Sequence, residues 1–531
     1  MLPTGHGICE GCRGDMISIT RYGPQAVLVR HSDRVTESAL ERGLALEAFL
    51  ESKAISGCVE RVPGFTTLLL RFDDAAPAPL EVLGERLAAD AWETAKSPRE
   101  SRLIRIPVTY GGLDLQQVAD HAGVRFEEVI ERHRGGNYRV HCLGFAPGFP
   151  YLGGLDSQLH TPRLSTPRLQ VPAGSVAIGG EHTGIYSVAS PGGWNVIGRT
   201  PALLFNPAGE VLEDLFLLRP GDRVRFEPED ESLSNRQAPE PMVEPGSIPF
   251  LRIAATGMGM TLQDAGRSGY ARFGVPPAGC MDPGLAAVAN RLVGNSPGSP
   301  LLELALQGQC FEVLCDGWLA LGGPKSGLPG KLGSAFRVRA GESLTFPPAP
   351  SGVWRYLAVP GGWAGRRLLG SASGGTRLGL EFMLQPGGVL RAASETTAQI
   401  PDSVARRTWA APVESMETAK PFRVWRGPQW DDFTEAARAQ FFQTAWSLSS
   451  QCNRVGYRLK GDPIHGVPDP GISEPVLPGS IQVPPDGQPI VTMPDGPTLG
   501  GYPKIGWIDA GERARLAQCR SGQTVRWSLC E

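Results

Sequence analysis

A three-part internal repeat is the feature that most constrains how this chain can fold. Three segments recur later in the chain in the same order: GSVAI (174–178), GGWNVIG (192–198) and RPGDRVRF (219–226) return as GSIQV (479–483), GGYPKIG (500–506) and CRSGQTVRW (519–527). A shared order and similar spacing indicate two copies of one structural unit. Both copies consist of short apolar runs between Gly and Pro residues, which is typical of β-barrels and sandwiches. The repeat therefore predicts two related β domains packed as a pseudo-symmetric pair.

The rest of the chain divides around these two units, and a length of 531 residues leaves room for several domains. Alternating strand and helix patterns over residues 17–108 predict a small α+β domain. We expect a first β-barrel domain over 109–230, opening with two short helices, and a larger unit with β-barrels over 248–531. Residues 1–16 are expected to be a disordered leader, and the polar, proline-rich residues 231–247 a linker. The predicted fold class is mainly β with α+β parts.

Composition excludes several classes of protein. A net charge of −3 gives no reason to expect nucleic acid or an anionic membrane as a partner. No apolar run approaches the roughly 20 residues of a membrane span, and the N-terminus has no apolar core of a signal peptide. The ten cysteines are scattered, as expected of reduced thiols in a cytoplasmic protein. Cys9 and Cys12 form a lone CxxC without a second pair, so we expect no metal site.

Signatures of self-sufficient enzymes are missing from the sequence. There is no G-x-x-x-x-G-K-[ST] phosphate loop, no G-x-S-x-G elbow and no H-E-x-x-H zinc motif. The stretch GSASGG (370–375) shares only its Gly/Ser composition with amidase nucleophile loops, and a β-turn is the simpler interpretation. An enzyme that needs a partner is therefore favoured over one that works alone.

Polar side chains that could converge on a ligand occur in three clusters. The first contains Arg163, Arg168, His182, Tyr186, Trp194 and Arg199. Forked arginines suit carboxylate or phosphate, although surface salt bridges explain any one of them equally well. His182 follows Glu181 and could equally be a hydrogen-bonded turn residue.

The other two clusters lie in the second half of the chain. The second contains Gln263, Asp264, Arg267 and Asp282. Because Pro283 follows Asp282 and Gly294 ends the apolar pattern, Asp282 also fits the N-cap of a helix. The third contains Arg454, Gln482, Asp495, Tyr502 and Lys504. A lysine after a Gly-Gly-Tyr-Pro turn can contact an anion, or have a shifted pKa if it is desolvated.

These motifs resemble a known pair of proteins. The stretch GFAPGFPYLGGL (144–155), with TPRLSTPR and the segment VPAGSVAIGGEHTGIYSVASPGGWNVIGRTP, resembles the B-type component of bacterial ATP-dependent 5-oxoprolinase, the KipI type. The stretches GMTLQDAGRSGYARFGVPPAGCMDP, GSIQVPPDGQPIV and GGYPKIG resemble the C-type component, the KipA type. The same modules form the carboxyltransferase part of urea carboxylase and have been labelled allophanate hydrolase subunits 1 and 2. The chain is thus identified as a B–C fusion from Ile17 onward.

The resemblance implies a fold and an activity. The two β units would be cyclophilin-like barrels, and the chain would act on 5-oxoproline with ATP and Mg²⁺, together with a separate A-type protein. Lys504, Arg454, Asp495 and His182 would take part in catalysis. The remaining members of the three clusters would bind the substrate, and Phe145, Phe149 and Tyr151 would line the pocket.

Two alternatives stay open. The chain could be a biotin-dependent carboxyltransferase component that acts on urea or a similar small amide, with a biotin carboxylase and a biotinyl carrier as partners. It could also be a regulator that binds a histidine kinase. Assembly with further copies of itself is compatible with each of these functions.

Overall fold

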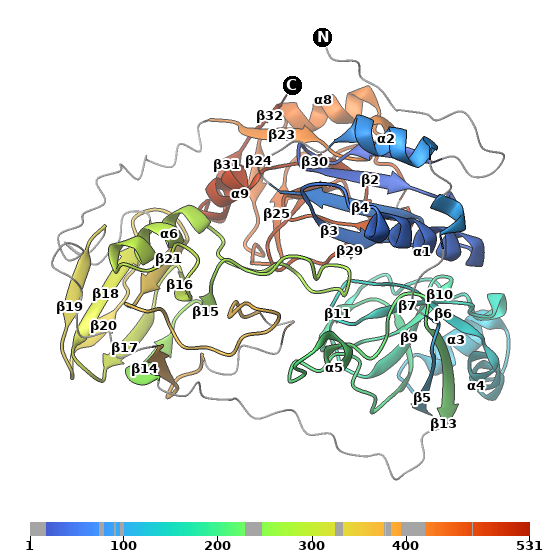
Figure 1. Cartoon of the computed structure of the whole chain (residues 1–531), viewed down its shortest axis with the longest axis horizontal. Coiled ribbons are helices and arrows are strands. Elements are labelled where there is room, and N and C mark those ends of the chain that lie inside the picture. Colours follow the sequence, from blue (N-terminus) through green and yellow to red (C-terminus); the bar gives the residue numbers. More distant parts are fainter. Residues whose placement is uncertain are drawn as a thin grey trace.

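The computed structural model describes residues 17–73, 79–89, 92–95, 100–228, 247–323, 333–375, 378, 384–393, 420–469 and 471–530. The predicted leader with Cys9 and Cys12, and the predicted linker up to residue 246, lie outside these residues. The described residues form four bodies: a small N-terminal domain, a first barrel, a two-sheet unit and a second barrel (Figure 1). None of the helices in these ranges combines the length and the apolar character needed to cross a bilayer.

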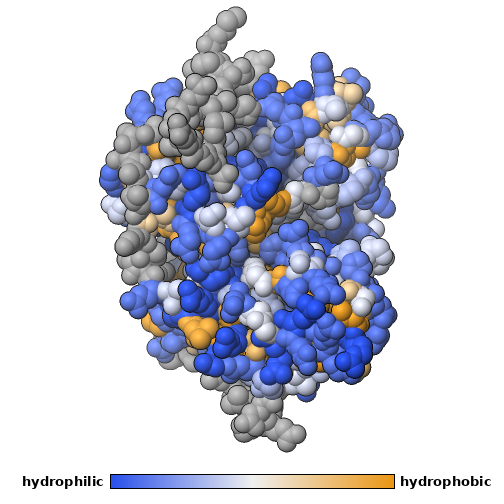
Figure 2. All heavy atoms as spheres, turned by 90° about the vertical axis from the view of Figure 1, so that its right-hand side faces the viewer, coloured by the Kyte–Doolittle hydropathy of each residue, from blue (hydrophilic) through white to orange (hydrophobic). Residues whose placement is uncertain are grey.

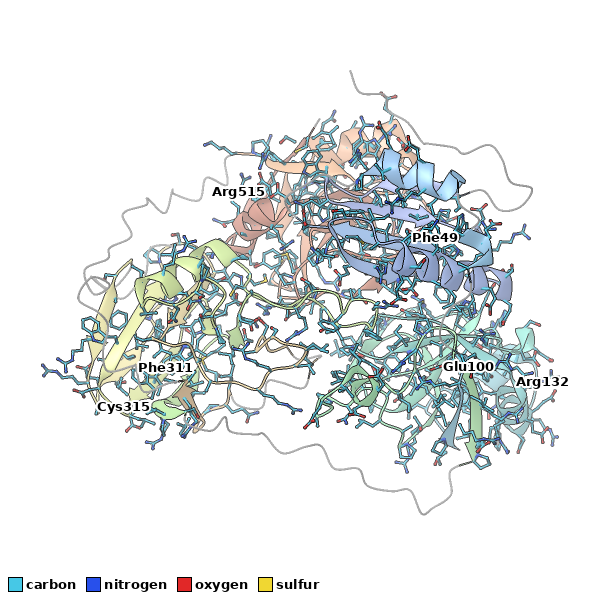
Figure 3. The ribbon with its side chains drawn as sticks, in the orientation of Figure 1. Phe49, Glu100, Arg132, Phe311, Cys315 and Arg515 are labelled. Carbon is cyan, nitrogen blue, oxygen red and sulfur yellow. The ribbon has the colours of Figure 1, made fainter. Side chains whose placement is uncertain are left out.

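The small domain is one antiparallel sheet with helices on one face. Its elements are β1 (Ser18–Arg21), β2 (Ala26–Arg30), α1 (Glu37–Ser52), β3 (Cys58–Pro63), β4 (Thr67–Phe72), α2 (Leu80–Ala89) and the 3-10 turn η1 (Trp92–Thr94), with sheet order β1-β2-β4-β3. Alternation decides the two faces, because successive strand residues point to opposite sides. Val27 and Leu70 pack under the helices, close to Phe49 of α1 (Figure 3), whereas Leu28 and Leu69 pack on the second barrel.

The first barrel is closed by seven strands in the order β10-β7-β6-β13-β5-β12-β9. Its elements are β5 (Leu103–Tyr110), α3 (Leu115–Ala122), α4 (Phe126–Gly135), β6 (Tyr138–Leu143), β7 (Pro150–Gly153), η2 (Ser157–Leu159), β9 (Ser175–Gly179), β10 (His182–Ile185), β12 (Asn195–Arg199), α5 (Leu212–Leu215) and β13 (Arg223–Pro228), with β8 (Arg168–Val171) and β11 (Ser190–Gly192) as a separate ribbon. The boundary expected at residue 108 is wrong, since β5 pairs with β12 and β13 and so belongs to the barrel. The two short helices predicted before the barrel strands are confirmed as α3 and α4, although they follow β5.

The two-sheet unit stacks a four-stranded sheet, β20-β17-β14-β22, and a five-stranded sheet, β15-β16-β21-β18-β19. Its elements are β14 (Ile248–Thr256), β15 (Met260–Gln263), α6 (Pro283–Leu292), β16 (Leu301–Ala305), β17 (Gln309–Val313), β18 (Gly317–Gly322), β19 (Ala335–Val338), β20 (Ser343–Thr345), β21 (Trp354–Ala358) and β22 (Val389–Ala392). The predicted N-cap of α6 is confirmed, because the Asp282 side chain accepts a hydrogen bond from Leu285 N at 3.1 Å.

The second barrel is one eight-stranded sheet in the order β31-β24-β25-β28-β27-β30-β23-β32. Its elements are β23 (Phe422–Arg426), η6 (Trp430–Asp432), α8 (Glu435–Gln443), β24 (Trp446–Leu448), β25 (Gly456–Lys460), β27 (Ser480–Gln482), β28 (Ile490–Thr492), β30 (Lys504–Trp507), α9 (Ala510–Ala517), β31 (Thr524–Val525) and β32 (Trp527–Leu529), with β26 (Glu474–Pro475) and β29 (Leu499–Gly500) as a separate pair. Only Arg526 separates the two edge strands, so one continuous segment joins both edges of the sheet. Arg515 of α9 (Figure 3) packs on Phe422 of β23. Its guanidinium carbon lies 3.8 Å from the centre of the Phe422 ring.

The two barrels repeat the same strand pairing. β9 pairs with β10 and β12, and its counterpart β27 pairs in the same antiparallel way with β28 and β30. The unusual parallel pair β5–β13 returns as β23–β32. Both β9–β12 and β27–β30 also contain a register shift. The internal repeat is therefore structural, and the prediction of two related barrel-like units is confirmed.

Candidate functional site

Loops from three of the four bodies meet at one place, which we call the junction. It consists of residues 144–149 of the first barrel, residues 264–282 and 366–375 of the two-sheet unit, and residues 494–499 of the second barrel. Gly148 N donates to Phe273 O at 2.8 Å, and Ala278 N donates to Pro494 O at 3.1 Å. Figure 1 shows the loops after β15 leaving the two-sheet unit and running to the middle of the molecule. Distant parts of the sequence thus share one site.

The junction contains strained backbone. Among the described residues, four non-glycine residues have a positive φ, and three of them lie here: Phe145 (φ 65), Ala278 (φ 53) and Leu369 (φ 52). Each such conformation costs on the order of 1–3 kcal/mol and persists only where the surroundings enforce it. Strain of this kind is concentrated at functional sites in proteins, so the junction is the leading candidate site.

A buried charge network joins the two-sheet unit to the second barrel. Arg454 donates from Nε and Nη2 to the two carboxylate oxygens of Asp495, both at 2.8 Å, and from Nη1 to Glu303. Burial disfavours the charged guanidinium, but the two carboxylates raise the pKa of Arg454 above its ordinary value. Burial raises the pKa of Glu303, against the opposing effect of Arg454. Two residues predicted for catalysis, Arg454 and Asp495, are therefore direct partners of one another.

Asp264 fastens two junction loops together. Its Oδ1 accepts hydrogen bonds from Ser371 Oγ at 2.5 Å, Ser373 Oγ at 2.6 Å and Gly266 N at 2.8 Å, and its Oδ2 accepts one from Ala372 N at 2.7 Å. The carboxylate is buried, and both of its oxygens accept hydrogen bonds. Asp264 therefore holds the Gly/Ser stretch 370–375 in place.

The other members of the second cluster surround the same stretch. Arg267 donates from Nη2 to Ser373 O at 2.6 Å, and Gln263 donates from Nε2 to Gly374 O at 3.0 Å. Asp282 caps α6 and also accepts from Gln518 Nε2 of the second barrel at 3.1 Å, while burial raises its pKa. The structure thus brings Gln263, Asp264 and Arg267 together and gives Asp282 a structural partner on another body.

The structure divides the third cluster into two sites. Lys504 is buried, and its Nζ lies 3.3 Å from Glu474 Oε2 and 3.3 Å from Gln429 Oε1. Burial lowers the pKa of Lys504, although Glu474 opposes this effect. In the described ranges, no hydrogen bond or ion pair links Lys504 to the Arg454 network. Gln482 instead donates to Thr492 Oγ1 at 2.9 Å, and Tyr502 is 41% exposed.

The three predicted pocket-lining rings form one aromatic cluster beside the junction. Ring centres are 5.4 Å apart for Phe145 and Phe149, 5.1 Å for Phe149 and Tyr151, and 5.5 Å for Phe149 and Trp194, all in edge contacts. Tyr186 of the first predicted cluster joins them 5.4 Å from Phe149. Leu499 of the second barrel packs into the same cluster, which ties the two barrels together.

His182 lies at the contact between the first barrel and the small domain. Its ring centre is 4.6 Å from that of Phe65 and 6.5 Å from that of His141. Burial lowers the pKa of each of these histidines to about 4, so both are neutral at neutral pH. Sequence reasoning missed His141, which lies three residues before the stretch GFAPGFPYLGGL (144–155).

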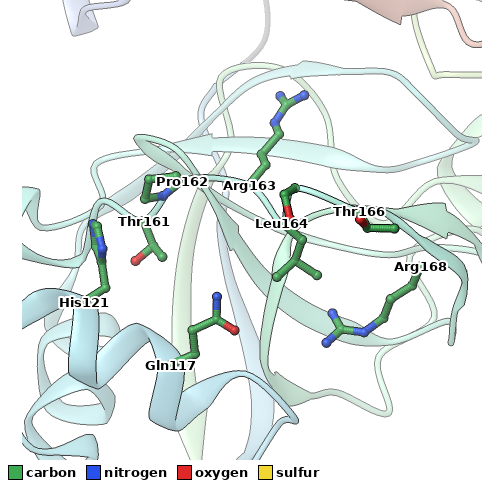
Figure 4. Close-up of a pocket in the computed structure, with 9 residues that line it drawn as sticks. Gln117, His121, Thr161, Pro162, Arg163, Leu164, Thr166 and Arg168 are labelled. Carbon is green, nitrogen blue, oxygen red and sulfur yellow. The ribbon is translucent and has the colours of Figure 1, made fainter.

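The arginines of the first cluster do not converge. Arg168 makes a bidentate pair with Asp114, at 2.6 and 2.8 Å, on the wall of an open pocket of about 390 Å³. In Figure 4, Arg163 points away from Gln117 and His121 of this pocket, and its guanidinium lies 5.8 Å from the Trp194 ring centre. Arg199 is exposed at the end of β12. Figure 2, which views the side of the small domain and first barrel, shows a mainly hydrophilic surface with small apolar spots.

Sequence reasoning also missed Glu303, Ser371, Ser373 and Glu474. Glu303 carried a usable signal, because a glutamate inside the apolar run LLELA must be buried and therefore paired. Ser371 and Ser373 lie in the stretch that was interpreted as a turn. In the described ranges, no group of three or more His, Cys, Asp or Glu side chains is placed to hold a metal ion.

Comparisons with known proteins match both halves of the chain. Residues 17–213 match the model of the carboxyltransferase domain, subdomain C and D, and residues 273–529 match that of the carboxyltransferase domain, subdomain A and B. The C subunit of 5-oxoprolinase from Escherichia coli strain K12 is 34% identical over 291 residues, which cover 53% of this chain and 91% of that protein. The B subunit of 5-oxoprolinase from Escherichia coli O157:H7 is 48% identical over 178 residues, which cover 33% of this chain and 80% of that protein.

A solved structure is similar along nearly the whole chain. The crystal structure of TTHA0988 has a TM-score of 0.81 at 34% identity and covers 95% of this chain and 100% of that one. The arrangement of all four bodies is therefore shared with an experimentally determined protein. Because the chain matches both the B subunit and the C subunit over most of their lengths, it belongs to the family of 5-oxoprolinase B and C subunits, built on the carboxyltransferase domains, and carries both in one polypeptide.

Proposed function

We propose that the chain is the fused B/C-type component of an ATP-dependent 5-oxoprolinase, which acts on 5-oxoproline together with a separate A-type protein. The observation that carries the proposal is the junction. There the half similar to the B subunit and the half similar to the C subunit each contribute loops, with strained backbone and buried charge. A site built from both halves of the chain is consistent with a family that has both B and C subunits.

The chemistry proposed for this site is activation of an amide. A lactam carbonyl is a poor electrophile. Transfer of the γ-phosphoryl group of ATP to its oxygen would give ADP and turn that oxygen into a leaving group. Attack by one water on the carbonyl carbon would break the ring C–N bond and give γ-glutamyl phosphate, and a second water would hydrolyse this acyl phosphate to glutamate and phosphate. Cationic side chains are needed to offset the charge that develops on the transferred group.

The geometry supports the proposed roles of individual residues to different degrees. Arg454 and Lys504 are both paired with carboxylates, so either would meet a phosphate only by exchanging its present partner. His182, neutral at neutral pH, could accept a proton. Arg163, Arg168 and Arg199 are separated from each other, so a joint role in holding the substrate carboxylate is the weakest of these proposals.

Reconstitution tests the function directly. The purified full chain, an A-type protein, Mg²⁺-ATP and 5-oxoproline are expected to release glutamate and ADP, and omission of any one of them should abolish glutamate release. Arg454→Met should remove the activity, whereas Arg252→Met, at an exposed ion pair of the two-sheet unit, should retain it. The proposal is wrong if no glutamate forms with an A-type protein that is active with separate B and C subunits.

Both matching domain models are described as carboxyltransferase domains, which favours a second candidate function. In it the junction would transfer a carboxyl group from biotin to urea or a similar small amide. Incubation of the chain with a carboxylated biotinyl carrier and labelled urea is the corresponding test. Transfer of the carboxyl group to the labelled amide, without any release of glutamate in the first assay, would favour this alternative.

A further inference from the structure

Gln263 at the end of β15 and Arg267 in the loop that follows each leave one buried polar atom without a partner. Gln263 is 0% exposed and Arg267 is 5% exposed. Across the described residues, Gln263 Oε1 accepts no hydrogen bond and Arg267 Nη1 donates none. A buried polar atom without a partner costs free energy, so each such atom in a folded protein calls for an explanation.

The remaining polar atoms of both side chains are held mainly by backbone carbonyls of residues 368–374. Gln263 Nε2 donates to Gly374 O and to Thr261 Oγ1, both at 3.0 Å. The amide cannot be turned round, because its oxygen would then face the carbonyl of Gly374. Arg267 donates from Nη2 to Ser373 O at 2.6 Å and from Nε to Leu368 O at 3.3 Å. One free acceptor and one free donor are therefore held in fixed positions by neighbouring carbonyls.

The charges around Arg267 select a neutral ligand group. Arg267 has no ion pair in the described ranges, and the two carboxylates that act on it, Asp264 and Asp495, are occupied by other donors. Burial lowers the pKa of Arg267 to about 10, which leaves the guanidinium charged at neutral pH. An incoming carboxylate would be repelled by Asp264 and Asp495, whereas a carbonyl oxygen would gain the hydrogen bond without that penalty.

We propose that Gln263 and Arg267 form a recognition pair for the edge of a small neutral amide. Arg267 Nη1 donates to the amide carbonyl oxygen, and Gln263 Oε1 accepts from the amide N–H. This inference rests on the proposed function in that it places the lactam of 5-oxoproline at the junction. It specifies the chemical class more closely, because it requires both the carbonyl and the N–H of the ligand.

The same unit supplies matched control residues. Gln309 is also fully buried, donates from Nε2 to two carbonyls and leaves Oε1 without a partner in the described ranges. Arg355 is likewise buried and donates to the carbonyls of Pro347 and Leu306. Both lie inside the two-sheet unit rather than at the junction, so they reproduce the burial without the proposed site.

Binding of a ligand series to the unmodified full chain tests the inference without any need for turnover. The probes are 2-pyrrolidinone, γ-butyrolactone, which has a ring oxygen in place of the N–H, N-methyl-2-pyrrolidinone, and cyclopentanecarboxylate as an anion. Ligand-observed NMR is expected to give 2-pyrrolidinone the lowest Kd, with roughly tenfold weaker binding of the lactone and the N-methyl lactam. Equal affinity for lactam and lactone, tighter binding of the carboxylate, or no binding of 2-pyrrolidinone would each overturn the inference.

Variants then test the acceptor role of Gln263 Oε1 and the donor role of Arg267 Nη1. Gln263→Met should make the Kd values for 2-pyrrolidinone and γ-butyrolactone about equal. Arg267→Met should weaken the binding of both ligands by roughly tenfold. Gln309→Met and Arg355→Met should leave the preference unchanged, and a changed preference in either would contradict the assignment. If a variant fails to fold, the ligand series on the unmodified chain still decides. Selective lactam binding without glutamate release would support this inference and reject the proposed function.

Discussion

At the scale of single residues, the buried histidine His133 shows how burial and hydrogen bonds keep an imidazole neutral. His133 lies in the core of the first barrel, with Nε2 2.9 Å from Thr183 Oγ1 and Nδ1 2.7 Å from the Tyr110 hydroxyl. Because Thr183 already donates to Ala177 O, Nε2–H must donate to Thr183, and Nδ1 accepts from Tyr110. The neutral ring is therefore fully hydrogen-bonded, and burial lowers the pKa of His133 to about 3.

This geometry predicts a loss of stability in acid. The folded pKa lies below the unfolded value of about 6.5, so the contribution of His133 is complete above pH 6.5 and is lost as the pH falls toward 3. His133→Gln is expected to reduce the slope of unfolding free energy against pH by about 1.4 kcal/mol per pH unit in that window, measured by urea unfolding. The exposed His465→Gln variant should keep the original slope, and an unchanged slope in His133→Gln would contradict the prediction.

Arg454 allows a second prediction at this scale. Removal of its guanidinium leaves the buried carboxylates of Asp495 and Glu303 without their shared partner. Arg454→Met is expected to lower the unfolding free energy by about 3–5 kcal/mol. Arg252→Met, at an exposed pair with Glu312, should cost at most about 1 kcal/mol. Equal losses of unfolding free energy for the two substitutions, measured by urea unfolding, would contradict the burial of the network of Arg454, Asp495 and Glu303.

Sequence reasoning identified these charged residues but not their partners. Arg454 and Asp495 were both selected, yet Glu303, 151 residues away from Arg454, was not. Lys504 was expected to contact an anion in catalysis, whereas the structure pairs it with Glu474. Glu474 also pairs with Arg30 of the small domain at 2.7 Å. Local patterns carry no information about such distant pairing, which is why these partners were missed.

At the scale of secondary-structure elements, local sequence rules were more reliable. The cap of α6, the two short helices α3 and α4 and the strand repeat all depend on residues close in sequence. The boundary at residue 108 failed because an alternating pattern over Leu103–Tyr110 predicts a strand without saying which sheet it joins.

Substitutions at Asp282, the N-cap of α6, distinguish a structural role of this residue from a role in substrate binding. Asp282→Ala is expected to lower the unfolding free energy by about 0.5–2 kcal/mol through loss of the α6 cap, as Thr434→Ala should do for α8. Asp282→Asn keeps the capping oxygen but loses the acceptor for Gln518 Nε2, so it should cost less stability than Asp282→Ala and should preserve glutamate release. Loss of activity in a stable Asp282→Asn variant would instead assign its charge to substrate binding.

At the scale of the whole molecule, the small domain and the junction hold the two barrels together. Tyr22 hydrogen-bonds to Ser480 of the second barrel at 2.6 Å, while Phe65 of the same domain packs into the aromatic cluster of the first. Leu499 crosses from the second barrel into that cluster, and a Cβ on Gly144 would lie 2.2 Å from its side chain. Glycine is therefore required at position 144 for this close approach.

The contact that Leu499 makes between the two barrels allows a prediction at the scale of the whole molecule. Leu499→Ala is expected to leave a cavity between the barrels, lower the unfolding free energy by about 2–5 kcal/mol and raise hydrogen exchange of residues 144–149. Leu113→Ala, where the side chain is 84% exposed, is the control and should change neither quantity. Unaltered exchange in residues 144–149 would show that the barrels are coupled elsewhere.

The sequence by itself determined the number and type of the repeating units, the N-cap of α6 and the family, because all of these depend on local patterns and motifs within this chain. Only the tertiary structure decided which buried charges pair, that Arg163, Arg168 and Arg199 stay apart, and that four loops form one junction. The physical reason is that periodicity and turn chemistry act over a few residues, whereas ion pairs and packed loops depend on how whole domains are placed against one another.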